Sequence, residues 1–267
     1  MNFKKHRLFD WLSEVRRDIH RNPEIAFEET RTTDRIKEIL TCYGVDLVEL
    51  EAPATGAVGV VECQPGDRVL ALRADIDGLP MEELNQAPYR SRRPGFMHAC
   101  GHDGHTAIML GVARELMETG LKNELKGAVK FIFQPAEEGV SGARVMIENG
   151  VLQTPRVDRI VAGHMWPELK AGQVGIYRQV SHASTDRFSV TITGKGAHGA
   201  KPHHGTDPIL AGGHFITAVH SIVSRNLDPA QAAVVTVGQF TSGTAANVIP
   251  ASAYMQGTVR AFTEDVR

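Results

Sequence analysis

The chain has 267 residues, of which 42% are hydrophobic and 22% charged, and its formal net charge is −2. This composition suits a globular protein of about two domains and excludes a charge-driven partner such as nucleic acid or an anionic membrane. No stretch approaches the ~20 apolar residues that span a bilayer, and the 3 cysteines are too few and scattered for a disulfide framework. We therefore expect a soluble, cytoplasmic protein.

Helical spacing of apolar residues predicts a first helix from Leu8 to the stop at Asn22-Pro23, and a second over 28–43, before Gly44. The period then changes, which indicates alternating strands and helices. In chain order these are strands 57–61 and 69–74, helix 106–117, strand 129–133, helix 143–148 and strand 160–162. This order predicts an α/β fold with a mostly parallel sheet flanked by helices.

The pattern changes again after Tyr177. The remaining chain predicts strand 188–193, helix 208–223 and strands 233–240 and 254–262. We expect this part to form a second, smaller α+β domain, and we place the boundary between residues 182 and 183.

Polar side chains follow three predicted strands of the first domain. Asp75 closes one strand, Glu137 and Glu138 follow the next, and His164 follows a third. Ligands of open α/β sheets bind outside the carboxyl ends of the strands. We therefore expect these side chains to meet at one edge of the sheet, together with the loop that contains Cys100.

That loop, residues 98–105, places one cysteine, three histidines and one aspartate within eight residues. Cys100 and His102 are two residues apart, so in an extended segment both side chains leave the same face and can reach one ion. The run is typical of half a metal site. Of the adjacent Glu137 and Glu138, one can bind metal while the other acts as general base.

Several segments together resemble one family. The sequence is similar to the hippurate hydrolase branch of the metallo-amidohydrolases, relatives of the aminoacylases and carboxypeptidases, in His98-Ala99-Cys100-Gly101-His102-Asp103-Gly104-His105, Gln134-Pro135-Ala136-Glu137-Glu138-Gly139, Gly163-His164 and Asn247-Val248-Ile249-Pro250. The resemblance implies a zinc-peptidase-like catalytic domain over 1–182. It also implies an inserted lid and dimerisation domain over 183–267, incomplete at its C-terminus.

The resemblance implies two divalent ions per site, zinc or manganese. Their ligands would be Cys100, His102, Glu138 and His164, and Glu137 would be the general base that shuttles the proton. The fifth ligand of the family, a histidine near the C-terminus, has no counterpart here, so we expect a weak second site. The implied reaction is hydrolysis of the amide bond of an N-acyl amino acid, such as a hippurate-like or N-acetyl substrate.

Three further residues receive roles from the resemblance. His198, in the segment 194–199, would help to hold the reacting carbonyl oxygen by reaching across a homodimer. Asn247 would lie near the substrate carboxylate, and Asp75 would orient a ligand histidine. The implied partners are thus a small-molecule substrate and a second copy of the chain, through the lid domain.

Other interpretations stay open. The chain can be a fragment, a truncated reading frame or half of a split enzyme, and then inactive or weak in metal binding. In a cysteine hydrolase Cys100 would be the nucleophile, with His102 or His105 as base, but the Glu137 and Glu138 pair would have no task. A non-catalytic zinc-binding module is a third interpretation.

Overall fold

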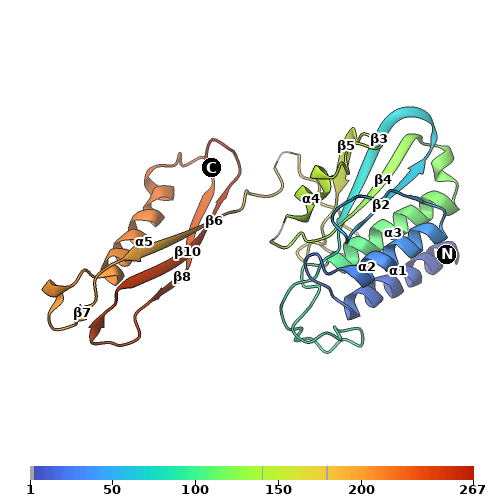
Figure 1. Ribbon diagram of the computed structural model, residues 1–267. Helices are drawn as coiled ribbons and strands as arrows, with labels where there is room; N and C mark the ends of the chain where they lie inside the picture. The colour runs from blue at the N-terminus through green and yellow to red at the C-terminus, as the bar shows by residue number, and fades with distance from the viewer. Residues whose placement is uncertain (1–2, 140, 179) are drawn as a thin grey trace. The chain divides into compact units, whose positions relative to one another are not determined.

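The computed structural model describes residues 3–139, 141–178 and 180–267. The chain divides into two compact units, Met1–Lys170 and Ala171–Arg267 (Figure 1). The division falls before the boundary predicted at 182 and 183. Among the described residues, no helix combines the length and apolar character that crossing a lipid bilayer requires.

The first unit contains a five-stranded sheet in the order β1-β2-β4-β3-β5. Its strands are β1 (Asp46–Leu47), β2 (Ala57–Glu62), β3 (Gln64–Asp75), β4 (Lys126–Gln134) and β5 (Arg159–Ala162). Strand β3 runs parallel to β4 and β5, but β2 runs antiparallel to β1 and β4. The α/β fold is confirmed, although the sheet is mixed rather than mostly parallel. Gln64 still continues the antiparallel register of β2 against β4, and the chain reverses between Gln64 and Val69, where the register of β3 shifts.

Helices cover both faces of this sheet. Alternate residues of β4 point to opposite faces, and Val129, Phe131 and Phe133 join the core formed with α1 (Phe3–Arg21), α2 (Thr30–Cys42) and α3 (His102–Glu118). Ile132 packs on the other face, against Met146 of α4 (Gly142–Glu148). The predicted helices and strands are present. The sequence did not predict β1 or the short 3-10 helix Leu121–Asn123.

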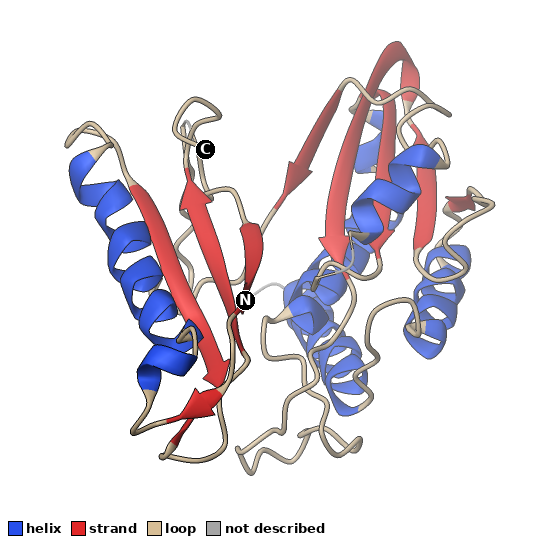
Figure 2. Ribbon diagram, turned by 60° about the vertical axis from the view of Figure 1, so that its left-hand side comes forward, coloured by secondary structure: helices blue, strands red, loops and turns tan. Residues whose placement is uncertain are grey.

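The second unit pairs one long helix with an antiparallel sheet (Figure 2). The sheet has the order β6-β10-β8. Asp207 caps α5, because its side chain accepts hydrogen bonds from the backbone nitrogens of Ile209 and Leu210. The elements are β6 (Asp186–Thr193), β7 (Ala197–His198), a 3-10 helix (Pro202–His204), α5 (Pro208–Arg225), β8 (Ala233–Ser242), β9 (Val248–Ile249) and β10 (Ser252–Ala261).

The strands β3, β4 and β5 are parallel, so their carboxyl ends meet at the same edge of the first sheet. β3 ends at Asp75, β4 at Gln134 and β5 at Ala162. The loops that follow these three ends hold the candidate ligands. The fold therefore gathers polar residues from distant parts of the chain, as the strand pattern predicted.

Candidate metal centre

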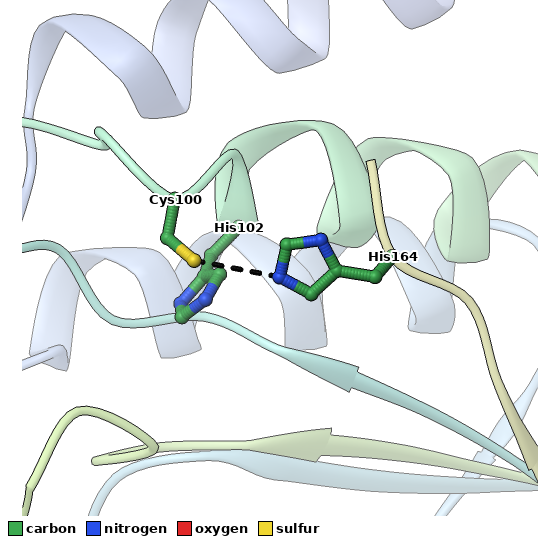
Figure 3. Close-up of side chains that lie close together, drawn as sticks. All are labelled: Cys100, His102 and His164. Carbon is green, nitrogen blue, oxygen red and sulfur yellow. Dashed lines mark hydrogen bonds between the residues drawn. The ribbon is translucent and has the colours of Figure 1, made fainter. Parts of the chain in front are cut away.

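Three potential ligands face one another at this edge. Cys100, His102 and His164 place their ligand atoms within 4.8 Å of one another. The Cys100 Sγ lies 3.4 Å from His164 Nε2, and Figure 3 shows Cys100 and His102, from the segment at the start of α3, converging with His164, which comes from another segment. A second group, His102, Glu137 and Glu138, meets the same distance limit. His102 belongs to both groups, so the two potential sites adjoin.

A turn at Gly101 brings Cys100 and His102 together. Gly101 has φ 86°, in the left-handed region that favours glycine, and it is the N-cap of α3. A Cβ at this position would lie 3.3 Å from the Cβ of Met165. His102 is the first residue of the helix, which begins four residues earlier than predicted at 106. The two side chains therefore converge through a turn and not, as we expected, along an extended segment.

Asp77 fixes the orientation of His102. The imidazole Nδ1 lies 2.9 Å from the carbonyl oxygen of Asp77 and 3.1 Å from its carboxylate Oδ1. Because both are acceptors, Nδ1 carries the proton and Nε2 has its lone pair free. The other carboxylate oxygen, Oδ2, accepts a hydrogen bond from the backbone nitrogen of Glu138 at 2.9 Å. Asp77 thus positions two candidate ligands at once.

Asp75 forms its histidine hydrogen bond with His105, and its Oδ2 also lies 3.7 Å from His102 Nε2. Asp75 Oδ1 accepts a 2.6 Å hydrogen bond from His105 Nδ1, and Asp75 Oδ2 accepts one from Arg73. His105 Nε2 in turn accepts a hydrogen bond from the backbone nitrogen of Met165. The role that the family resemblance implies for Asp75, orienting a ligand histidine, stays a prediction, and the side-chain hydrogen bond to His102 comes from Asp77. Asp75 anchors the segment after β5, through His105.

His164 follows β5 and is exposed. Its Nδ1 donates a 2.7 Å hydrogen bond to the backbone carbonyl of Met165, so Nε2 carries the lone pair and accepts the hydrogen bond of the Cys100 thiol. As with His102, the second ring nitrogen sets the tautomer.

The donor set fits divalent metal ions. His102 Nε2 is buried and has no hydrogen-bond partner, although a buried polar atom normally has one. A bound cation would remove this defect. A thiol, two imidazoles and carboxylates form a borderline sphere that suits zinc and is compatible with manganese. The residues present therefore fit a metal centre.

Negative charge is concentrated at the same place. Burial, together with the charges of Glu138 and Glu137, raises the pKa of the Cys100 thiol to about 12. Burial and the neighbouring Glu138 carboxylate also raise the pKa of Glu137. A divalent cation would stabilise these groups in their charged forms.

A buried carboxylate supports the loop that contains the two glutamates. Ala136 has φ 51°, an uncommon conformation for a residue with a Cβ. Its backbone nitrogen donates a 2.8 Å hydrogen bond to Glu29 Oε1, while Glu29 Oε2 accepts one from the Thr55 hydroxyl at 2.8 Å. Burial raises the pKa of Glu29. This contact holds a strained backbone directly before Glu137.

An ionic group around the buried Asp103 lies beside residues 98–105 and was not predicted from the sequence. Asp103 Oδ2 accepts hydrogen bonds from Arg16 Nε at 2.7 Å and from His20 Nδ1 at 2.8 Å, and His20 Nε2 lies 3.1 Å from Glu83 Oε1. The only signal in the sequence was a histidine on the buried face of the first helix, which is most often a packing residue. The group ties α1 to the first turn of α3.

The second unit brings its two predicted site residues together. Strands β7 and β9 pair His198 with Val248, and the backbone nitrogen of Gly199 donates a 2.7 Å hydrogen bond to the carbonyl of Asn247. His198 Nδ1 accepts a hydrogen bond from the backbone nitrogen of Ala200. The side chains of His198 and Asn247 are both exposed.

Residues 71–264 match the model of Peptidase family M20/M25/M40. The chain is 42% identical over 256 residues to the N-acetylcysteine deacetylase of Bacillus subtilis, a match that covers 96% of this chain and 66% of the relative. It is 39% identical over 253 residues to the hippurate hydrolase of Campylobacter jejuni, with coverage of 95% and 65%. The chain thus spans about two thirds of the length of these relatives.

Solved structures agree with these matches. A putative aminohydrolase from methicillin-resistant Staphylococcus aureus superposes with a TM-score of 0.86 at 39% identity, over 96% of this chain and 67% of that one. A Bacillus subtilis protein described as a dinuclear metal binding peptidase of the M20 family gives a TM-score of 0.81 at 37% identity, over 98% and 67%. The family model, the related sequences and the fold agree, so this chain belongs to the peptidase family M20/M25/M40.

Proposed function

We propose that the protein hydrolyses the amide bond of N-acyl amino acids with two divalent metal ions, zinc or manganese, held by Cys100, His102, Glu138 and His164. The observation that carries this proposal is the junction of two potential ligand groups at His102, whose buried Nε2 has no hydrogen-bond partner. The relatives named as a deacetylase and a hippurate hydrolase support the substrate class.

The chemistry divides between the metal ions and Glu137. Bound divalent ions supply polarisation of the amide carbonyl and a lowered pKa for a nearby water. The Glu137 carboxylate accepts a proton from that water as the water oxygen bonds to the carbonyl carbon. When the carbon–nitrogen bond breaks, Glu137 gives the proton to the leaving nitrogen. The products are a carboxylic acid and a free amino acid, and Glu137 returns to its starting state.

The raised pKa of Glu137 supports this role. A proton shuttle works best when its pKa approaches the operating pH, because the group must both accept and release the proton. Glu137 is more exposed than Glu138, whose backbone nitrogen is fixed by Asp77. This difference supports Glu138 as the ligand and Glu137 as the base.

The second unit would complete substrate binding. In this proposal His198 holds the reacting carbonyl oxygen in a homodimer, and Asn247 binds the substrate carboxylate. Their closeness within the second unit supports a joint task, since the Gly199 backbone bonds to the Asn247 carbonyl. Exposed side chains on this loop are free to meet a substrate.

A cysteine hydrolase fits the site less well. A nucleophilic cysteine needs a lowered pKa, whereas burial and the two nearby glutamates raise the pKa of Cys100. Treatment with a chelator and treatment with a thiol alkylator, the latter on metal-loaded protein, separate the two mechanisms. We expect loss of hydrolysis with the chelator only. Loss with the alkylator alone would favour a cysteine nucleophile.

The sharpest test replaces the two adjacent glutamates one at a time in the full protein. Glu137→Gln should lower the rate of hippurate hydrolysis about 10²- to 10⁴-fold, because general acid–base catalysis contributes on that scale, and should retain metal. The matched control, Glu138→Gln, should lower the metal content itself. Hydrolysis rates and metal analysis by mass spectrometry measure both. An unchanged rate in Glu137→Gln would exclude Glu137 as the base.

A further inference from the structure

A long irregular loop precedes the segment that contains Cys100. Residues 80–96, which we call the 80–96 loop, contain neither helix nor strand, and the structure describes all of them. The two ends of the loop are joined where the backbones of Leu79 and Met97 exchange hydrogen bonds of 2.8 and 3.0 Å. Part of the loop lines a cavity of about 450 Å³ that Cys100 also lines. Loops of this length without secondary structure are uncommon in compact domains and are usually functional.

A carboxylate is the only buried residue of this loop, all of whose residues the structure describes. Glu83 is 8% exposed, whereas the neighbouring Leu84 is 85% exposed. Asn85 and Ser91 donate hydrogen bonds to Glu83 but belong to the loop itself. The third donor is His20 Nε2 of α1, which lies 3.1 Å from Glu83 Oε1. An ionic contact, and not apolar packing, therefore ties the buried side chain of the loop to the rest of the fold.

His20 is doubly protonated in this arrangement. Its other ring nitrogen, Nδ1, lies 2.8 Å from Asp103 Oδ2 at the start of α3. Burial alone would raise the pKa of Glu83 and of Asp103, but their hydrogen bonds lower both pKa values, so both groups are ionised. Because ionised carboxylates only accept hydrogen bonds, both ring nitrogens carry a proton and the ring is a cation. The hydrogen bond to Asp103, against the effect of burial and together with that to Glu83, raises the pKa of His20 above its ordinary value of 6.5.

Three further groups lie around His20. Arg16, one turn earlier on α1, donates a 2.7 Å hydrogen bond to the same oxygen of Asp103. The ring centroids of Tyr89 and His98 lie 5.6 and 6.3 Å from that of His20. Both nitrogens of His98 are buried without a hydrogen-bond partner, and burial lowers its pKa to about 4. His98 is therefore neutral and adds no charge that competes with His20.

Loss of one proton from His20 breaks its contact with the loop. The bond to Asp103 is the shorter of the two, so the remaining proton stays on Nδ1, and Nε2 then faces Glu83 Oε1 with a lone pair. Asp103 keeps Arg16 as a charged donor. The other donors to Glu83 are uncharged and lie within the loop. The contact between Glu83 and α1 is therefore the one that depends on this proton.

We propose that protonated His20 holds the 80–96 loop closed against α1, and that loss of its proton raises the population of an open loop that gives access to the cavity beside Cys100. Because the pKa of His20 is raised in the folded state, the contact is complete below the ordinary pKa and is lost as the pH rises through the raised one. The Arg17 guanidinium, 5.0 Å from the centre of the Tyr89 ring, adds a contact that does not depend on His20. The inference does not rest on amide hydrolysis, since neither metal nor substrate takes part.

The test follows the opening of the loop by limited proteolysis of the full chain, without added metal or substrate. Trypsin cleaves after Arg90, next to the Ser91 nitrogen that bonds to Glu83, and mass spectrometry measures the rate of that cut. When the loop opens and closes faster than it is cut, this rate reports the open population. Division by the rate for the free peptide 86–95 at the same pH removes the pH dependence of trypsin. Nitrogen NMR of the His20 ring measures its pKa and its number of N–H groups.

We expect two ring N–H groups on His20 at neutral pH. The normalised rate should rise with pH by about tenfold for each unit by which the measured pKa of His20 exceeds 6.5. His20→Gln should be cut at the high rate at every pH. Glu82→Gln, the matched control at the adjacent carboxylate, should respond to pH as the unmodified protein does. A single ring N–H at neutral pH, a rate that does not change with pH, or an equal rise in His20→Gln would overturn the inference.

A second variant keeps the test decisive if His20→Gln does not fold. Glu83→Gln retains the shape of the side chain but removes the charge that favours the second proton of His20, so the rate should rise less with pH than in the unmodified protein. An equal rise in Glu83→Gln would overturn the role of this contact. Hydrolysis plays no part in these measurements. A chain that cleaves no amide yet shows this pH response keeps the inference, and an active chain without it loses the inference.

Discussion

The candidate ligands of the first unit and the candidate substrate residues of the second are held in different ways. His102 is buried, and a carboxylate that is itself buried fixes its ring. His198 and Asn247 are exposed, and the contacts that hold their loop run mainly through the backbone. Side chains locked by a second layer of hydrogen bonds can hold a fixed geometry. The first unit thus carries a prearranged centre, whereas the second offers groups that need a substrate or a partner to fix them.

Among the substitutions that compare the support of the two units, the largest expected effect is that of His198→Ala in the second unit. His198→Ala should lower kcat for hippurate about 10²- to 10³-fold, the usual loss when one donor to a developing oxyanion is removed. The metal content should not change, because His198 lies outside the prearranged centre. Steady-state kinetics and metal analysis measure the two quantities.

Mixing experiments sharpen this prediction. If His198 acts across a dimer, subunits with His198→Ala and subunits with Glu137→Gln, denatured together and refolded, should regain part of the activity that each variant lacks. Each mixed dimer would then contain one site with both groups intact. A mixture that stays as inactive as its parts would contradict a site shared between subunits.

The next largest expected effect is a loss of zinc affinity in the first unit when Asp77 is replaced. Asp77→Ala should weaken zinc binding about 10- to 100-fold, since partners that orient a ligand histidine contribute on that scale. Asp77→Asn keeps an oxygen for His102 Nδ1, so its loss should be smaller. Competition with a fluorescent chelator measures the dissociation constants. If Asp77→Ala bound zinc as tightly as the unmodified protein, zinc binding would not depend on the hydrogen bond between His102 and Asp77.

The segments that contain the proposed ligands have local signals in the sequence, and the family resemblance selected the four ligands among them. Residues 98–105 are rich in donor side chains, and Glu138 and His164 follow apolar strands whose ends must meet in a parallel arrangement. The hydrogen bond of Asp77 to His102 had no such signal, and the role that the resemblance gives to Asp75 stays a prediction. Strand β3 ends at Asp75, so the loop beyond it, and not strand alternation, sets the direction of Asp77.

The supporting contacts had no such signal. Glu29 reaches Ala136 across 107 positions of sequence, and His20 reaches Asp103 across 83. Both are ordinary polar residues near helices, and only the packed fold shows that they are buried. The antiparallel pairing of β2 with β4 is non-local in the same way. Sequence patterns thus gave the elements and the donors but not the partners.

Glu29 allows the support of the first unit to be tested through stability. Glu29→Ala leaves the Ala136 nitrogen and the Thr55 hydroxyl without their acceptor, and it should lower the free energy of unfolding by about 1–3 kcal/mol, the cost of an unsatisfied buried group. Urea unfolding measures this change. Glu29→Gln, which retains an acceptor for Ala136, should lose less. Equal losses in both variants would argue that side-chain volume, and not hydrogen bonding, matters here.

The stability of Glu29→Gln, compared with that of the unmodified protein, should depend on pH. Because burial raises the folded-state pKa of Glu29 above its ordinary value of 4.5, the protonated form favours folding. Its contribution is complete below the unfolded pKa and is lost as the pH rises through the folded pKa. Glu29→Gln does not titrate, so its stability relative to the unmodified protein should increase as the pH rises across this window.

The smallest expected effect lies in the second unit and leaves the centre untouched. Asp207→Ala removes the N-cap of α5, where Asp207 Oδ1 accepts hydrogen bonds from Ile209 at 2.8 Å and Leu210 at 3.2 Å. The loss should be about 1 kcal/mol of unfolding free energy. Zinc affinity should stay the same, since the proposed ligands belong to the other unit. The control Asp265→Ala removes an exposed carboxylate in a turn and should change the free energy of unfolding by less than about 0.5 kcal/mol.

A drop in zinc affinity for Asp207→Ala would contradict this expectation. It would show that zinc binding in the first unit depends on the stability of α5 in the second unit. The first unit could then no longer be described as prearranged independently of the second.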